Sequence, residues 1–156
     1  LLVLPRGTIV LELDKKAHEA IKTLCAEGDA LAGRGGYREA IDLYNNAYKL
    51  IPDPKNEFEA TTWVLTALGD SCFLGGWYTS GQEAFEYAVS CPGGLGNPFI
   101  HLRLGQCEYE RGNNERAADE LARAYMGAGS EIFETEDQKY FQFLKSQIEP
   151  PVGGAW

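Results

Sequence analysis

The side chains best suited to catalysis or metal binding are few and scattered in this sequence. Its two histidines, His18 and His101, lie far apart and have no cluster of cysteines or carboxylates around them. The four cysteines, at positions 25, 72, 91 and 107, form no C-x-x-C pair. No serine–histidine–acid or paired-carboxylate arrangement occurs in a supporting context. We therefore expect no metal, no cofactor and no enzymatic activity, with histidines in packing or surface roles and cysteines as reduced core residues.

An excess of acidic residues narrows the classes of partner. The chain has 156 residues, with 14 lysines and arginines against 23 aspartates and glutamates, a formal net charge of −9. Such a charge repels phosphate backbones and anionic lipids, so we expect neither nucleic acid nor membrane as a partner. A basic protein surface would be attracted instead, and no small-molecule substrate is expected. The opening residues lack the features of a signal peptide, which favours a cytoplasmic location.

Three segments of the sequence share small and large residues at equal spacings. Each begins at a glycine and has a second glycine seven residues later, a large apolar residue after sixteen and an alanine after nineteen. In chain order, these sets are Gly28, Gly35, Tyr44 and Ala47; Gly69, Gly76, Phe85 and Ala88; and Gly105, Gly112, Leu121 and Ala124. Small residues let two helix backbones approach closely, and the second glycine permits a tight turn between them. The large residue fills the space beside that contact.

This pattern resembles the tetratricopeptide repeat (TPR), a pair of antiparallel helices that stacks on its neighbours. The resemblance implies an all-α, TPR-type α-solenoid with three helix-turn-helix repeats, at about residues 21–54, 62–95 and 98–131. A C-terminal capping helix over residues 135–148 would complete a single domain over residues 14–149. Residues 150–156 would then form a C-terminal tail.

Capping residues predict where several of the helices begin. Asp14 is suited to cap the first helix, and Asn97 followed by Pro98 is a favourable start for the fifth. Two further starts are predicted from apparent capping boxes, Ser80 with Glu83 and Thr135 with Gln138. The expected helices are then 14–33, 37–50, 56–75, 81–91, 98–111, 114–126 and a seventh that ends at residue 148.

The N-terminal residues 1–13 are expected to form an extended arm. Thr8–Leu13 is the one strand-like stretch, and the predicted helices offer it no sheet edge within the chain. Two interpretations remain open. The arm packs on the first helix, or it adds as a strand to a partner.

The TPR resemblance also implies a concave groove lined by the first helix of each pair. The candidate lining residues are Lys22, Cys25, Asp29 and Ala32 in pair one, Trp63, Thr66, Asp70 and Phe73 in pair two, and Phe99, Leu102, Arg103, Gln106 and Tyr109 in pair three. Such a groove would be aromatic and acidic, with one arginine. Aromatic side chains and arginine are frequent anchors of protein interfaces. For the four aromatic residues, packing between repeats is the alternative role.

One branch of the TPR family binds the acidic tails of chaperones through lysine and asparagine side chains on the first helices. The positions where those asparagines would stand carry Asp29, Asp70 and Gln106 in this sequence. Two aspartates would repel a terminal carboxylate. We therefore do not expect binding of this kind.

A second acidic cluster stands before the last predicted helix. It consists of Glu131, Glu134, Glu136 and Asp137. Negative charge at the start of a helix is favourable on its own, because it complements the helix dipole. Docking of a basic partner is the alternative interpretation of these four carboxylates.

The segment 97–148 resembles small bacterial TPR immunity proteins, which are encoded beside polymorphic toxins of contact-dependent or type VI secretion systems. This resemblance implies a non-catalytic interaction module that binds and neutralises a basic toxin domain. A secretion chaperone that holds an extended segment in the groove is the alternative. The length, acidity and repeat number favour it, whereas the long insertions between repeats do not. A generic scaffold is the third possibility.

Overall fold

Seven α-helices account for most of the residues that the computed structural model describes, which are 2–4 and 8–156. They are α1 (Lys15–Ala32), α2 (Tyr37–Lys49), α3 (Glu59–Leu74), α4 (Tyr78–Val89), α5 (Pro98–Glu110), α6 (Asn114–Ala128) and α7 (Gln138–Gln147). Two short 3-10 helices, η1 (Lys55–Glu57) and η2 (Ser130–Phe133), precede α3 and α7. No helix of this described part has the length and apolar character that crossing a membrane requires.

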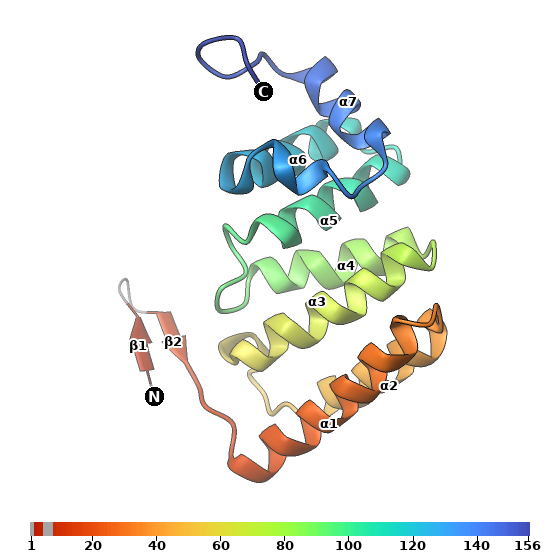
Figure 1. Ribbon diagram of the computed structural model, residues 1–156. Coiled ribbons are helices and arrows are strands. Elements are labelled where there is room, and N and C mark those ends of the chain that lie inside the picture. The colour runs from red at the N-terminus through yellow and green to blue at the C-terminus, as the bar shows by residue number, and fades with distance from the viewer. Residues whose placement is uncertain (1, 5–7) are drawn as a thin grey trace.

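The helices form three pairs that stack in chain order (Figure 1). Within the pairs, α1 packs on α2, α3 on α4, and α5 on α6. Between the pairs, α2 packs on α3 and α4 on α5, and α7 covers the end of the stack beside α6. The prediction of an all-α solenoid of stacked helix pairs with a C-terminal capping helix is therefore confirmed.

The repeated glycines have the structural roles that their spacing predicts. Gly35, Gly76 and Gly112 have φ angles of 80°, 86° and 81° in the turns between paired helices. These left-handed conformations favour glycine, since a side chain would be strained there. At the first glycine of each repeat, an added β-carbon would lie within 2.8 Å of the large residue sixteen positions later. Those large residues are Tyr44, Phe85 and Leu121, and all three are buried.

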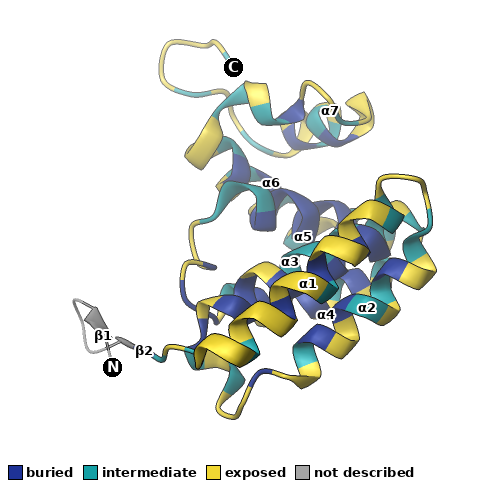
Figure 2. Ribbon diagram, turned by 60° about the horizontal axis from the view of Figure 1, so that its bottom comes forward, coloured by how far each residue is buried: buried dark blue, intermediate teal, exposed yellow. Residues whose placement is uncertain are grey.

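Buried residues concentrate where one helix packs on the next, whereas the outward faces of α1 and α2 are largely exposed (Figure 2). The core runs along the stack as three adjoining clusters, one near each helix pair. The last cluster extends beyond the repeats, because Tyr140 and Leu144 of α7 pack on Leu121 and Phe133. The capping helix is thus held by a buried apolar stripe, as its sequence predicts.

Two of the predicted helix starts are correct and two are wrong. Asp14 accepts a hydrogen bond from the Ala17 amide at 2.8 Å, and Asn97 caps α5 through the amides of Phe99 and Ile100. The Ser80 box, however, does not cap α4, which begins at Tyr78. The turn before α4 is closed by the backbone, with the Trp77 amide donating to the Cys72 carbonyl at 2.8 Å.

The seventh helix also begins later than its apparent capping box predicts. Its first residue is Gln138, and its cap is Asp137, whose carboxylate accepts a hydrogen bond from the Lys139 amide at 2.9 Å. Thr135 lies outside the helix, and its hydroxyl bonds to the neighbouring Glu136. A carboxylate next to the helix therefore replaces the predicted threonine cap.

The N-terminal arm is extended over its described residues, and it finds partners within the chain. Strand β1 (Leu2–Leu4) pairs antiparallel with strand β2 (Thr8–Val10), while residues 1 and 5–7 of the predicted arm lie outside the described residues. The Leu11 amide then donates to the Glu57 carbonyl at 2.7 Å. The strand-like stretch therefore finds its edge in β1 of the arm itself, which was not expected, and a single parallel bridge joins Leu11 to Phe58 beside η1.

Candidate functional site

A pocket of about 480 Å³ lies between α3 and α5, on the side of the solenoid formed by the first helices of the pairs. Four of the predicted binding residues line it, namely Trp63, Thr66, Asp70 and Phe99. Glu59, eleven residues before Asp70 on the same helix, adds a second carboxylate to the lining. We call this the α3–α5 pocket. It combines two exposed or half-buried aromatic rings with two acidic side chains.

Trp63 extends this surface toward the N-terminal arm. Its side chain is 37% exposed, and the His18 ring meets it edge-on at a centroid distance of 6.4 Å. A second pocket of about 280 Å³ begins on the other side of Trp63 and is lined by residues 10–13 of the arm. Trp63 therefore lines two pockets, the α3–α5 pocket and this smaller one. The acidic residues of the smaller pocket are Glu12 and Glu59.

The predicted arginine of the groove, Arg103, is engaged by the protein itself. It is 7% exposed and donates to Asp70 at 2.6 Å, to Gln106 at 2.8 Å and to Glu136. Its guanidinium also lies over the rings of Phe73 and Phe99, at 4.7 and 5.0 Å from their centroids. Stacking and charge pairing of this kind suit the planar guanidinium group. Its charge is neutralised internally.

The same contacts close the α5–α7 end of the predicted groove. Gln106 is fully buried and donates to Glu136 at 2.7 Å. Tyr109 meets Tyr140 and Phe143 of α7 at ring-centroid distances of 5.4 and 5.0 Å. The structure thus places Arg103, Gln106 and Tyr109 where they hold the capping helix, with Phe73 packed against the same aromatic group.

The predicted residues of α1 lie outside the α3–α5 pocket. Lys22 and Asp29 are both exposed, whereas Cys25 is buried. The Asp29 carboxylate accepts a hydrogen bond from the Tyr44 hydroxyl at 2.6 Å. Burial, reinforced by this bond, raises the pKa of Tyr44 well above its usual range. Asp29 therefore joins α1 to α2, in addition to any contact with a partner.

The second acidic cluster divides into residues with different surroundings. Glu131 and Glu134 are exposed, and Asp137 caps α7. Glu136 is only partly exposed and pairs with Arg103. Glu136 is therefore engaged within the chain, whereas the other three residues of the cluster are exposed.

The four cysteines are free thiols, and each is buried. Burial raises the pKa of Cys25 and of Cys72 to about 11, and that of Cys107 to about 12. These thiols stay protonated near neutral pH, so they are poor nucleophiles and poor metal ligands. Within the described part of the chain, no group of three histidine, cysteine, aspartate or glutamate side chains is placed to hold a metal ion.

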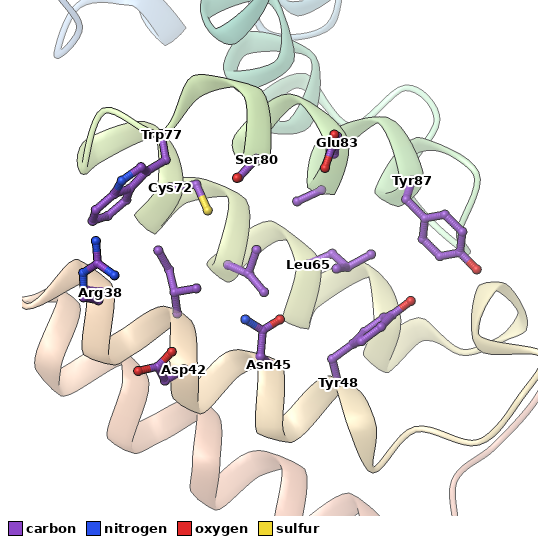
Figure 3. Close-up of a pocket in the computed structure, with 13 residues that line it drawn as sticks. Arg38, Asp42, Asn45, Tyr48, Leu65, Cys72, Trp77, Ser80, Glu83 and Tyr87 are labelled. Atoms are coloured by element: carbon purple, nitrogen blue, oxygen red, sulfur yellow. The ribbon is translucent and has the colours of Figure 1, made fainter.

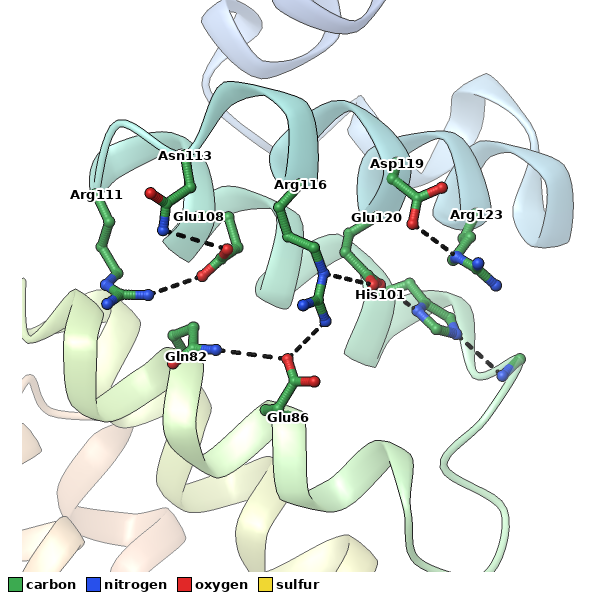
Figure 4. A network of polar contacts seen from close by, with 11 residues as sticks. Gln82, Glu86, His101, Glu108, Arg111, Asn113, Arg116, Asp119, Glu120 and Arg123 are labelled. Atoms are coloured by element: carbon green, nitrogen blue, oxygen red, sulfur yellow. Dashed lines mark hydrogen bonds and ion pairs between the residues drawn. The ribbon is translucent and has the colours of Figure 1, made fainter.

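A network of polar contacts between α4, α5 and α6 was not anticipated from the sequence (Figure 4). His101 is buried, and its Nδ1 lies 2.6 Å from a Glu120 oxygen. The Gly96 amide donates to His101 Nε2 at 3.0 Å, so Nδ1 carries the proton that Glu120 accepts. Arg116 joins Glu120 to Glu86 of α4 at 3.4 and 2.6 Å. The one sign of this network in the sequence is the spacing of Arg116 and Glu120 by four residues, which makes them neighbours on a helix.

Replacing His101 with alanine is expected to lower the free energy of unfolding by about 1–3 kcal/mol. The change leaves the buried Glu120 carboxylate and the Gly96 amide without this partner, and an unsatisfied buried group costs about that much. Urea denaturation followed by circular dichroism measures the effect. His18→Ala is the control, because His18 is exposed and its loss should cost less than about 0.5 kcal/mol. Equal losses in the two variants would contradict the structural role of His101.

Comparison with known proteins identifies the fold of the chain, but neither a protein family by sequence nor a partner. No protein-family model matches the chain, and no curated protein matches it. Among solved structures, the first TPR domain of Spaghetti (RPAP3), bound to the HSP90 peptide SRMEEVD, is similar with 18% identity and a TM-score of 0.61, over 82% of this chain and 92% of that one. The first TPR domain of human RPAP3 is similar with 21% identity and a TM-score of 0.65, over 82% and 94% of the two chains.

A third similar structure is the TPR domain of Sgt2 from Aspergillus fumigatus. It has 19% identity and a TM-score of 0.61, over 92% of this chain and 82% of that one. All three are TPR domains, so this chain has the TPR fold. Identities this low say nothing about which partner the chain binds.

Proposed function

We propose that the protein is a non-catalytic protein-interaction module that binds a basic partner at the α3–α5 pocket. The observation that carries this proposal is the chemistry of the pocket. It offers the rings of Trp63 and Phe99 beside the carboxylates of Glu59 and Asp70. The nearby cation, Arg103, is already neutralised by Asp70 and Glu136. Aromatic anchors with complementary charge are what protein-binding sites commonly use.

The charge of this pocket argues against an acidic ligand. The Spaghetti domain, for comparison, is described with the peptide SRMEEVD, which contains three acidic residues. In this chain, such a peptide would bring its carboxylates toward Glu59 and Asp70, and the net charge of −9 adds to the repulsion. Basic side chains of a partner would instead be attracted to Glu59 and to the one negative charge that remains where Arg103 pairs with both Asp70 and Glu136.

The finer part of the proposal is that the partner is a basic toxin domain and that this chain is its cytoplasmic immunity protein. The acidic charge and the resemblance of residues 97–148 to such proteins support it. Co-expression with the product of the adjacent gene tests it. A stable complex that protects the host cell is expected. Absence of both complex and protection would refute the immunity role, and preference for an unfolded segment would indicate a secretion chaperone instead.

Truncating Trp63 is expected to weaken the complex by tenfold or more. A central, partly exposed tryptophan contributes about 2 kcal/mol or more at an interface, and about 1.4 kcal/mol corresponds to tenfold. Isothermal titration calorimetry of Trp63→Ala with the purified partner measures this. Leu74→Ala is the matched control, because Leu74 is an exposed apolar residue of the same helix that does not line the pocket. Unchanged affinity in Trp63→Ala would move the binding surface elsewhere.

A further inference from the structure

A groove of about 510 Å³ lies on the other side of the solenoid, between the second helices α2 and α4 (Figure 3). Leu65, Leu68 and Cys72 of α3 form its apolar floor. Aromatic side chains stand at both ends. Trp77 is at one end, and Tyr48 and Tyr87 are at the other (Figure 3). We call this the α2–α4 groove.

Between α4 and α6, the corresponding position is bridged by an ion pair, and the repeat register shows why the two places differ. Arg116 spans it by pairing with Glu86 and Glu120 (Figure 4). Arg116 is the eleventh residue after Gly105, and the eleventh residue after Gly69 is Ser80. Likewise, Glu86 is the seventeenth residue after Gly69, and the seventeenth after Gly28 is Asn45. The α2–α4 groove is open because short, neutral side chains replace this ion pair.

The walls of the groove carry negative charge that the chain does not neutralise. Asp42 extends from α2 and Glu83 from α4, and both are exposed (Figure 3). Among the residues whose side chains the structure describes, 10–156, no ion pair or side-chain hydrogen bond engages either carboxylate. Arg38 lies at the end of the groove, with its guanidinium 5.3 Å from the Trp77 ring centroid. A ligand therefore meets an apolar floor between two free carboxylates.

We propose that the α2–α4 groove is a second binding site, which receives a segment of a partner protein carrying an arginine flanked by apolar residues. The arginine would lie between Asp42 and Glu83, as Arg116 lies between Glu86 and Glu120 one repeat later. Its apolar neighbours would cover Leu65 and the rest of the floor. Arginine suits the site better than lysine, because its planar group pairs with carboxylates and stacks on aromatic rings.

The test is a titration of the isotope-labelled full-length chain, followed by heteronuclear NMR. The probes are the peptide acetyl-Leu-Arg-Leu-amide and its counterpart with glutamate in place of arginine. We expect the basic peptide, at millimolar concentration, to shift the Trp77 indole signal and the amides of Leu65 and Cys72 in a saturable way. The glutamate peptide should leave these signals unchanged, because its charge is repelled by Asp42 and Glu83.

A variant that fills the groove makes the test specific. Asn45→Glu with Ser80→Arg transplants the ion pair of the next repeat, and it should weaken binding of the basic peptide by about tenfold or more. The matched control is Asn46→Glu with Thr79→Arg. It adds the same charges to the same helices at exposed positions that do not line the groove. Circular dichroism spectra of both variants establish that they are folded.

Several results would overturn the proposal. These are no saturable shift, equal shifts with the glutamate peptide, or equal loss of binding in the filled and control variants. Shifts confined to Trp63 and Phe99 would also overturn it, while supporting the α3–α5 pocket. A concentration-dependent dimer that the filled variant abolishes would make a second copy the occupant instead. The two sites are separable, since Trp63→Ala should leave the groove titration unchanged.

Discussion

Replacing Arg103 with alanine is expected to lower the free energy of unfolding by about 3–5 kcal/mol. Removing one member of a buried ion pair is this costly because the partner charge is left without compensation. Here two carboxylates lose their cation, those of Asp70 and Glu136, and the Glu136 side chain is only 13% exposed. The stacking of the guanidinium between Phe73 and Phe99 is lost as well.

Chemical denaturation of the Arg103→Ala variant measures this loss, and Arg123→Ala is the matched control. Arg123 also pairs with a carboxylate, that of Asp119, but both side chains are at least half exposed. Exposed pairs of this kind contribute about 0.2–1 kcal/mol, so the control should unfold almost like the natural chain. A loss below about 1 kcal/mol in Arg103→Ala would show that water compensates the two carboxylates.

The same variant should loosen the capping helix before the rest of the solenoid. Glu136 lies two residues before α7, so its bond to Arg103 ties this end of the chain to α5. Hydrogen exchange of the α7 amides is therefore expected to accelerate in Arg103→Ala more than exchange of the α3 amides. Uniform acceleration across the chain would mean that the arginine stabilises the whole solenoid and not its end.

The fold was predictable from the sequence because its determinants recur. A glycine, a second glycine and a large residue at fixed spacings describe one helix pair, and three copies define the stack. The helix starts at Ser80 and Thr135 were mispredicted because a capping consensus is local. In the structure, a backbone bond from the Trp77 amide closes the turn before α4, and the Asp137 carboxylate caps α7. The sequence alone does not show which of these groups will bond to the first amides of each helix.

The candidate site was only partly predictable, for a related reason. Trp63, Thr66, Asp70 and Phe99 line one pocket, and each occupies a repeated position on a first helix, which is the pattern that the sequence shows. The burial of Arg103 was not foreseen. It depends on Glu136, which lies 33 residues later and outside the repeated pattern. The α2–α4 groove was also missed, although its cause is visible once Ser80 is compared with Arg116.

Truncating Phe85 to alanine is expected to cost about 3–5 kcal/mol of unfolding free energy, the usual range for a large buried ring. Phe85 is fully buried in the second core cluster. Gly69→Ala should cost about 1–3 kcal/mol in the natural chain, because its new carbon would lie 2.8 Å from the ring of the fully buried Phe85. Both values follow from denaturation curves of the single variants.

The double variant separates this contact from every other role of Gly69. A carbon added at Gly69 has only Phe85 ring atoms as its three nearest neighbours, so removing the ring removes the clash. Gly69→Ala should then be neutral or stabilising in the Phe85→Ala background, because alanine favours a helix over glycine by about 1 kcal/mol. The two losses would be strongly non-additive. Additive losses would mean that the spacing of sixteen residues does not reflect a direct contact, and that another constraint keeps the glycine in each repeat.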